Sequence, residues 1–251
     1  RVPTLLLGAL FILQAIESPA VAESSADREY AAAVIVGDNQ PGSVLPRWHG
    51  HEVIFRIIYV GNSTLLDQLP SVIPARAWIE EQLRNEAHLP LTVVTEDTTT
   101  VPKIDVAQPI VDLLVLDEHV PSKLDELGVQ HDQGTERIRS RGLFNCELAR
   151  WQNGVNIVKA VGVLHLTSDI PSNVKCVSMA LLYGLGFGVT SRHFGSKPSS
   201  GVMTSYLLDP SIDMTLPTGV DIDMVRLLYS GDMPADATRS DALKAILRLP
   251  D

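Results

Sequence analysis

The sequence predicts one compact α/β or α+β domain over residues 47–251, preceded by a polar N-terminal extension over residues 23–46. Runs rich in β-branched and aromatic residues alternate with helix-like segments in the first half. Helix-like segments dominate the end of the chain, and no internal repeat is present. We therefore expect an α+β fold with an α/β-like N-terminal half.

The N-terminal half of this domain begins with Val53–Val60, a β-branched and aromatic run that is typical of a strand. Pro74 opens a predicted helix that continues to His88 on an imperfect apolar stripe, because proline fits the first helical turn. Two further strands are expected at Leu91–Val94 and Ile110–Leu116, with a threonine-rich loop between them.

The second half begins with the charged segment Asp117–Arg141, for which we expect a loop with one short helix. The apolar pattern of Val155–Leu166 predicts a long strand or a hairpin. Cys176–Leu185 is predicted to form a buried helix, and Gly219–Tyr229 and Arg239–Leu247 are predicted helices that close the chain.

Composition excludes several classes of protein. The 251 residues carry 30 acidic and 20 basic side chains, which gives a formal net charge of −10. Such a surface repels a phosphate backbone, so no nucleic-acid partner is expected. A hydrophobic fraction of 45% is too high for a disordered chain, and two cysteines are too few for a small disulfide-rich scaffold.

Residues 1–22 have the pattern of a secretory signal peptide. Arg1 gives a positive start, Leu5–Ile16 is a largely apolar run, and Ala-Val-Ala at residues 20–22 fits the rule for cleavage after small residues. The apolar run is shorter than the roughly 20 residues that cross a bilayer. We therefore expect a secreted protein, periplasmic or extracellular, with no transmembrane span after signal cleavage.

Cys146 and Cys176 are the only cysteines. An even number of cysteines in an exported chain favours one disulfide, which would close a loop of about 30 residues and add roughly 3 kcal/mol to the free energy of unfolding. Two buried free thiols are the alternative. A catalytic thiol has less support, because no basic or histidine-rich segment is placed to lower its pKa.

The segment from Cys176 to Ser230 contains three short sequences in order: CVSMALLYGLGFGV, SSGVMTSYLLDP and LPTGVDIDMVRLLYS. Together they resemble the C-terminal half of metzincin-type zinc peptidases, especially the matrixin-like ones. Those families carry HExxHxxGxxH on a helix and the following turn, then a methionine-containing turn and a closing helix. The resemblance implies a zincin-like domain with a mixed twisted sheet, packed helices and a helical C-terminal part.

Zinc chemistry at such a site depends on four residues that this chain lacks. Two histidines one helical turn apart and a third after the turn bind the metal, and a glutamate activates the bound water. Here Met179 and Tyr183 stand at the first two histidine positions, Val189 at the third and Ala180 at the glutamate. The resemblance therefore implies a scaffold with no metal, no cofactor and no catalytic residue.

Structural positions of the same pattern are retained. Gly186 matches the glycine of the turn, and Met203 matches the methionine turn, where Tyr206 also lies. The closing helix retains Asp221, Ile222, Leu228 and Tyr229. This combination is typical of a pseudoenzyme, which keeps a fold after losing its reaction.

Residues 46–248 also resemble the secreted bacterial proteins of the domain-of-unknown-function 2927 family. The resemblance lies in Arg47-Trp48, Val53–Val60, Gly61, Ala75–Leu89 and the two cysteines. That family typically reads C-x-x-E-E-x-x-Q-x-L-G after its second cysteine. This chain keeps Cys176, Leu185 and Gly186 but has Met179, Ala180 and Tyr183 at the three polar positions. A plainer interpretation stays open: MALLYGLG is also typical of an ordinary core helix, in which methionine fills gaps.

Histidines elsewhere give weaker candidates. His49 and His51, followed by Glu52, are spaced to share one face of a strand and could bind a metal, although a solvated loop is the plainer interpretation. His193 follows the lost third-ligand position without a partner histidine, and His165 lies on the predicted long strand as a surface or core residue.

Other reaction signatures are missing from the sequence. It has no Gly-x-Ser-x-Gly elbow for a serine nucleophile and no phosphate-binding glycine loop. The acidic pairs Asp117-Glu118 and Asp221/Asp223 lack the spacing of a calcium loop and are expected on solvated faces.

Two functional hypotheses follow. The first is an exported, non-catalytic protein that binds another protein or a cell-envelope component, with the former cleft at Met179, Tyr183 and Val189 as an apolar contact groove. The alternative is a hydrolase with a non-standard active site in the same cleft, built on Tyr183, His193 or nearby acids. A structural subunit of the envelope is a variant of the first hypothesis that differs in stoichiometry.

Overall fold

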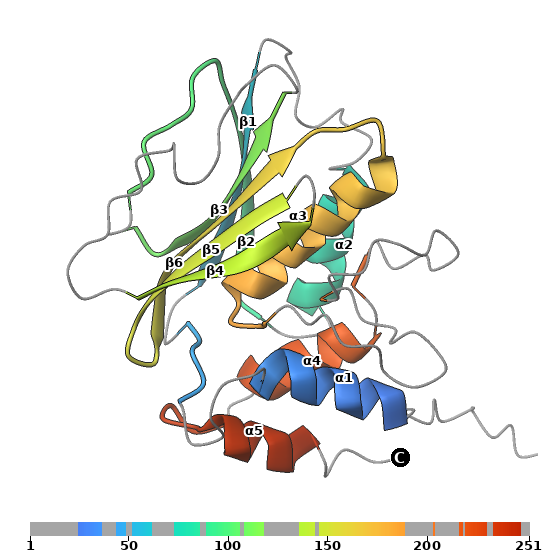
Figure 1. Ribbon diagram of the computed structural model, residues 1–251, viewed down its shortest axis with the longest axis vertical. Helices are drawn as coiled ribbons and strands as arrows, with labels where there is room; N and C mark the ends of the chain where they lie inside the picture. The colour runs from blue at the N-terminus through green and yellow to red at the C-terminus, as the bar shows by residue number, and fades with distance from the viewer. Residues whose placement is uncertain are drawn as a thin grey trace, which may run out of the picture.

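The computed structural model describes residues 25–36, 44–48, 52–61, 73–85, 89–105, 108–117, 136–143, 146–188, 203, 216–217, 219–229 and 233–246. These residues form a mixed α/β structure in which helices cover one face of a sheet (Figure 1). The coarse fold class that the sequence predicts is therefore confirmed. None of the described helices is long and apolar enough to cross a membrane.

The described part of the chain contains a six-stranded mixed sheet with the strand order β2-β1-β3-β6-β5-β4. The strands are β1 (Val53–Val60), β2 (Leu91–Thr98), β3 (Ile110–Leu116), β4 (Glu136–Leu143), β5 (Cys146–Asn153) and β6 (Asn156–His165). Strands β2, β1, β3 and β6 are parallel, whereas β5 and β4 continue the sheet in antiparallel pairs.

Both faces of this sheet are buried. Phe55, Leu113 and other residues on one face pack beneath the helices, while Leu114, Trp151 and others form a second apolar cluster on the opposite face. Strands buried on both faces read as continuous apolar runs rather than as alternating ones. This explains why the central strands at Val53–Val60 and Ile110–Leu116 match their predicted bounds.

The helices form two groups (Figure 1). Helix α3 (Ile170–Gly184) lies against the sheet. The shorter α2 (Ile73–Trp78) packs on α3 and continues as a π-helical turn over Ile79–Leu83, which contacts β2. The second group comprises α1 (Ser25–Val36), α4 (Gly219–Tyr229) and α5 (Arg239–Ile246), which pack on one another. The predicted helix over Gly219–Tyr229 is confirmed in full, and the last predicted helix ends one residue earlier than expected.

The polar extension expected over residues 23–46 is wrong for residues 25–36, because they form α1. Three of its residues, Tyr30, Val34 and Ile35, are fully buried in the main core. The first turns of α1 carry charged residues, so the composition of this segment looks polar although one face of the helix is apolar. The N-terminal helix therefore belongs to the packed domain.

Three other boundaries differ from expectation. The charged segment predicted as a loop contains part of β4, although residues 118–135 lie outside the described part. The expected long strand is the second strand of a β5–β6 hairpin that turns at Gly154, and β2 continues past Val94 to Thr98. Helix α3 begins at Ile170 rather than at Cys176, with a proline in its first turn.

The turn that follows α3 requires a glycine. Gly186 has φ = +113°, and a Cβ built there would lie 2.4 Å from the carbonyl oxygen of Pro46. By contrast, Gly154 has φ = +58° and no atom within 4 Å of such a Cβ. A side chain at Gly154 would therefore meet only an unfavourable φ, whereas a side chain at Gly186 would also collide with Pro46.

We expect Gly186→Ala to lower the free energy of unfolding by at least about 2 kcal/mol, since it adds a backbone collision to an unfavourable φ. Gly154→Ala is the matched control, with an expected loss of about 1 kcal/mol from conformation alone. Urea unfolding of both variants measures the difference. Equal losses would contradict the close packing of this turn on Pro46.

Candidate functional site

The candidate site lies on helix α3, which approaches the sheet closely at two glycines. A Cβ at Gly162 of β6 would lie 2.8 Å from the Cβ of Ala180, and a Cβ at Gly184 would lie 2.6 Å from Val111 Cγ1. Missing side chains at these two contacts allow the helix to lie directly on β3 and β6. Ala180, the residue at the glutamate position, therefore faces the sheet.

The other altered positions of the zinc pattern are also filled by packing. Met179, Ala180 and Tyr183 are each only 2% exposed and belong to the main apolar core. The Arg150 guanidinium lies over the Tyr183 ring, and the distance from Arg150 Cζ to the ring centroid is 4.7 Å. Met179 and Tyr183 therefore do not line an open groove, contrary to the expectation from the sequence. Val189 lies outside the described residues.

The retained positions of the pattern lie close together in space. The hydroxyl of Tyr30 on α1 donates to Asp221 Oδ1 on α4 at 2.7 Å, and the backbone N–H of Met203 donates to the same hydroxyl at 2.9 Å. Asp221, Met203 and Leu228 are all fully buried. One tyrosine thus connects the methionine of the predicted turn with the predicted closing helix, while Tyr206 lies outside the described residues.

The solvated position expected for Asp221 is wrong, because the Tyr30 hydroxyl holds its carboxylate inside the protein. Asp223 does lie at the surface, where it pairs with Arg226 at 2.7 Å. The charge of Asp221 alone does not show in the sequence that it is buried while Asp223, two residues later, is exposed. The partner that stabilises it is 191 residues away in the sequence.

Three buried arginines surround the C-terminal ends of three helices. Arg150 on β5 donates to the carbonyl oxygens of Tyr183 and Phe187, at 2.8 and 3.2 Å, where α3 ends. Arg47 donates to Leu228 O of α4 at 2.7 Å and to carbonyl groups after it.

The third of these arginines, Arg239, donates to the carbonyl oxygen of Ile35 at the end of α1. A helix C-terminus carries partial negative charge and unpaired carbonyl groups, so each arginine supplies what that helix end lacks. Burial lowers the pKa of Arg150. Two aromatic residues complete the region: Trp48 Nε1 donates to Gly184 O at 2.8 Å, and the Tyr229 hydroxyl donates to Leu185 O at 2.7 Å.

The predicted disulfide between Cys146 and Cys176 is confirmed, with an S–S distance of 2.07 Å. Cys146 is the first residue of β5 rather than part of a loop, and Cys176 lies inside α3 rather than at its start. Both residues are buried. The bond therefore attaches the candidate-site helix to the sheet.

A charged cluster on the opposite face of the sheet is absent from the sites that the sequence predicts. Lys159 Nζ lies 2.6 Å from Asp112 Oδ2, and Arg56 donates to both carboxylate oxygens of Asp112, at 2.8 and 3.1 Å. Lys159 and Asp112 are almost fully buried, and burial lowers the pKa of Lys159 although Asp112 opposes this. Single charges inside the runs IVDLLVL and NIVKAVGVLH are the signal that could have revealed the pair.

Among the remaining candidates, the described residues form no group that could act in catalysis or bind a metal ion. His49, His51 and His193 lie outside the described residues, and Glu52 accepts a hydrogen bond from the Thr92 hydroxyl. His165 is half-buried at the end of β6, in register with Leu116. Within the described part of the chain, no three His, Cys, Asp or Glu side chains are grouped so that they could hold a metal ion.

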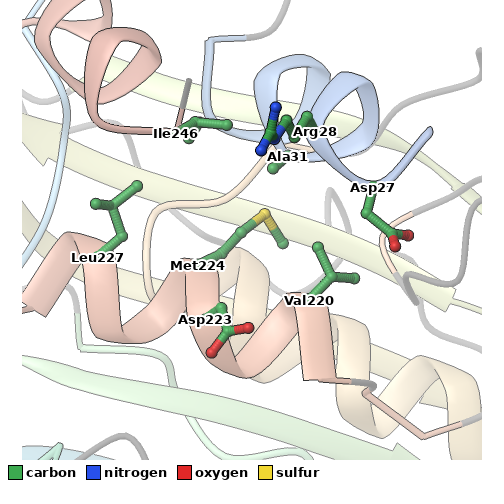
Figure 2. A pocket seen from close by; sticks show the side chains of 8 residues that line it. All are labelled: Asp27, Arg28, Ala31, Val220, Asp223, Met224, Leu227 and Ile246. Atoms are coloured by element: carbon green, nitrogen blue, oxygen red, sulfur yellow. The ribbon is translucent and has the colours of Figure 1, made fainter. Parts of the chain in front are cut away.

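A small depression lies where α1 meets α4 and the end of α5 (Figure 2). Its interior is about the size of one water molecule. The lining residues are Asp27, Arg28, Ala31, Val220, Asp223, Met224, Leu227 and Ile246. The lining is mainly apolar, as expected for a gap between packed helices rather than for a reaction centre.

Comparisons with protein families, curated proteins and solved structures find no match to this chain. Any function must therefore be inferred from the residues themselves. The described part of the site offers a rigid buried helix, three arginine-capped helix ends and a disulfide. These features position a backbone firmly, and they bring no nucleophile and base together.

Lys175 on α3 gives this region a measurable pH dependence. Burial lowers its pKa to about 8, although the charge of Asp221 opposes the shift. The unfolded chain has the usual lysine pKa of roughly 10.4, so it binds more protons than the folded chain between these two values. The free energy of unfolding therefore rises as the pH increases through this window and is lowest below it.

We expect Lys175 to contribute a rise of up to about 3 kcal/mol in the free energy of unfolding between pH 8 and pH 10, measured by urea unfolding as the difference between wild type and Lys175→Met. Lys175→Met should remove this rise, because it removes the group that titrates. Lys244→Met, at a lysine that is 64% exposed, is the control and should keep it. The same pH slope in wild type and Lys175→Met would contradict the assignment.

Proposed function

We propose that this chain is an exported, non-catalytic protein on a zinc-metallopeptidase-like scaffold, and that it binds another protein or a component of the cell envelope. The observation that carries the proposal is the burial of Met179, Ala180 and Tyr183 in the core. These are the residues at the positions where the resemblance would require two zinc ligands and a general base. The thioether of Met179 and the buried phenol of Tyr183 are poor zinc ligands, and Ala180 has no group that could move a proton.

The zincin-like scaffold is supported by the positions that remain. A sheet with α3 packed on it is followed by a turn at Gly186, by Met203 and by α4, which is the order that the resemblance implies. Tyr30 joins Met203 and Asp221 through its hydroxyl group. The structural positions of the pattern are retained while its zinc ligands and general base are lost, which favours a scaffold that acts by binding.

Export is supported by the disulfide. Cys146 and Cys176 are bonded, and such bonds persist in oxidising compartments such as the periplasm and the extracellular space. The acidic net charge of −10 is also compatible with a soluble secreted protein. Residues 1–22, which carry the signal-like pattern, lie outside the described part.

The rival hydrolase gains no support from the geometry of Tyr183. Its side chain is 2% exposed and its ring is covered by the Arg150 guanidinium. A substrate could reach the phenol only after this packing opened. His193, the other residue of the rival hypothesis, lies outside the described residues.

The purified protein should bind no stoichiometric zinc after dialysis against the metal, and it should cleave none of a broad panel of peptides and glycans. Elemental analysis and mass spectrometry of the panel measure both. A matrixin-type peptidase treated identically controls for zinc loading and peptide cleavage, and an active glycosidase controls for the glycan panel. One equivalent of zinc together with chelator-sensitive peptide cleavage would overturn the proposal, and turnover lost in Tyr183→Phe would establish the rival.

Binding is tested by cross-linking the protein in native envelopes and then rebuilding the complex from purified components. We expect a saturable complex of defined stoichiometry. A reconstituted complex that never saturates, or no complex at all, would contradict the binding role and leave only the non-catalytic scaffold.

Processing of the N-terminus tests export directly. We expect the protein recovered from the periplasm or culture medium of an expressing bacterium to begin at Glu23, after cleavage behind Ala22. N-terminal sequencing measures this. Replacing Ala20 and Ala22 by bulky residues is the control and should leave the precursor uncleaved. Full-length protein retained in the cytoplasm would contradict the assignment.

A further inference from the structure

Lys159 of β6 and Asp112 of β3 are held in contact inside the protein. Lys159 Nζ lies 2.6 Å from Asp112 Oδ2, and the two side chains are 0% and 2% exposed. An amine and a carboxyl group are the two reactants from which an amide bond forms. The fold thus holds such a pair together and keeps both groups away from water.

The register of the sheet fixes this contact. β3 and β6 are neighbouring parallel strands in which Asp112 is paired with Val161. Lys159 comes two residues before Val161, so its side chain lies on the same face of the sheet as Asp112. On the other side of β6, Lys159 is paired with Trp151, a fully buried member of the apolar cluster on this face. Permanent proximity of this kind replaces the collision that two separate reactants would need.

Burial favours the form of the pair that can react. An ammonium and a carboxylate both lose their hydration inside a protein, which is unfavourable for each ion. Burial accordingly lowers the pKa of Lys159, although Asp112 and, more weakly, Asp105 oppose the shift. Transfer of one proton from Nζ to Oδ2 along their contact gives an uncharged amine, which is a nucleophile, beside an uncharged carboxyl group. Condensation of these two groups removes both buried charges permanently.

Arg56 lies where the attack develops negative charge. Its Nε donates to Asp112 Oδ1 at 2.8 Å, and its Nη2 donates to Oδ2 at 3.1 Å. Attack of the amine on the carboxyl carbon moves an electron pair onto the oxygen that does not receive the proton, which here is Oδ1. A fixed donor at 2.8 Å has the distance that stabilises such an oxyanion. Protonation of Oδ2 weakens the ion pair with Arg56, so we expect a slow reaction that each molecule performs once.

We propose that Lys159 and Asp112 condense to an isopeptide bond, which joins β6 to β3 covalently. Lys159 Nζ attacks Asp112 Cγ and forms the new C–N bond. The Cγ–Oδ2 bond then breaks, and Oδ2 leaves as water with two protons, the one transferred before the attack and a second that Nζ loses as the new bond forms. Oδ1 remains as the amide oxygen next to Arg56. The step consumes no oxidant, reductant or second substrate, and the inference does not depend on the proposed binding function.

Intact-mass spectrometry of the purified protein, denatured after reduction of its disulfide, tests the bond. We expect a mass that is lower than that of the same chain in linear form by one water molecule. The modified fraction should grow when the folded protein is incubated and should not grow in concentrated denaturant, because only the fold holds the two groups together. Lys159→Arg is the matched control: it keeps the positive charge but lacks the primary amine, so it should keep the full linear mass.

Tryptic digestion followed by tandem mass spectrometry locates the lost water. We expect one branched peptide that contains both Asp112 and Lys159, with no cleavage after Lys159. Loss of water without this branched peptide would indicate a cyclised aspartate and would overturn the proposal. The full linear mass in wild type after several days of incubation, with circular dichroism showing that the protein stays folded, would overturn it as well. Both decisive measurements use the wild-type chain, so they hold even if Lys159→Arg does not fold.

Discussion

The structure depends on three helix C-termini that end inside the protein, each on a buried arginine. Arg150, Arg47 and Arg239 donate to carbonyl groups at the ends of α3, α4 and α1. A buried carbonyl without a partner costs about 1–3 kcal/mol, and each helix end exposes several. The arginines come from β5, from the segment before β1 and from α5, so every cap also joins two parts of the chain. Arg150 thereby joins α3 to the sheet, Arg47 joins α4 to the segment before β1, and Arg239 joins α1 to α5.

The sheet uses charge differently on its two faces. On the helix side, Arg150 donates to two carbonyl groups and lies over the Tyr183 ring, while its Nε is buried without a hydrogen-bond partner. On the other side, Lys159 and Arg56 share the carboxylate of Asp112 inside an apolar cluster. Replacing one member of such a group leaves an uncompensated buried charge. This lowers the free energy of unfolding far more than replacing the whole group by apolar residues would. The register that places Arg56 of β1 beside Asp112 of β3 is thus specified by charge as well as by shape.

The sequence predicts the central strands and the closing helix well, because strands buried on both faces and amphipathic helices have local patterns. It predicts the disulfide from cysteine count alone. It misses β5, in which Glu147, Arg150 and Gln152 interrupt the apolar residues, and it misses α1, whose charged first turns conceal Tyr30. The sequence also predicts a surface position for Asp221, because Tyr30, the residue that holds its carboxylate inside, is distant in sequence. Contacts of that kind leave no local periodicity to detect.

The hydrogen bond between Tyr30 and Asp221 joins residues 191 positions apart, near the two ends of the described chain. Closing so long a loop carries a large entropic cost before any contact repays it, and such non-local contacts slow folding. Helix α1 is synthesised first, yet its buried face finds its partners on α4 and α5, which are synthesised last. A chain that folded as it emerged would leave Tyr30, Val34 and Ile35 exposed until the end. Completion of this fold therefore waits until α4 and α5 have been synthesised.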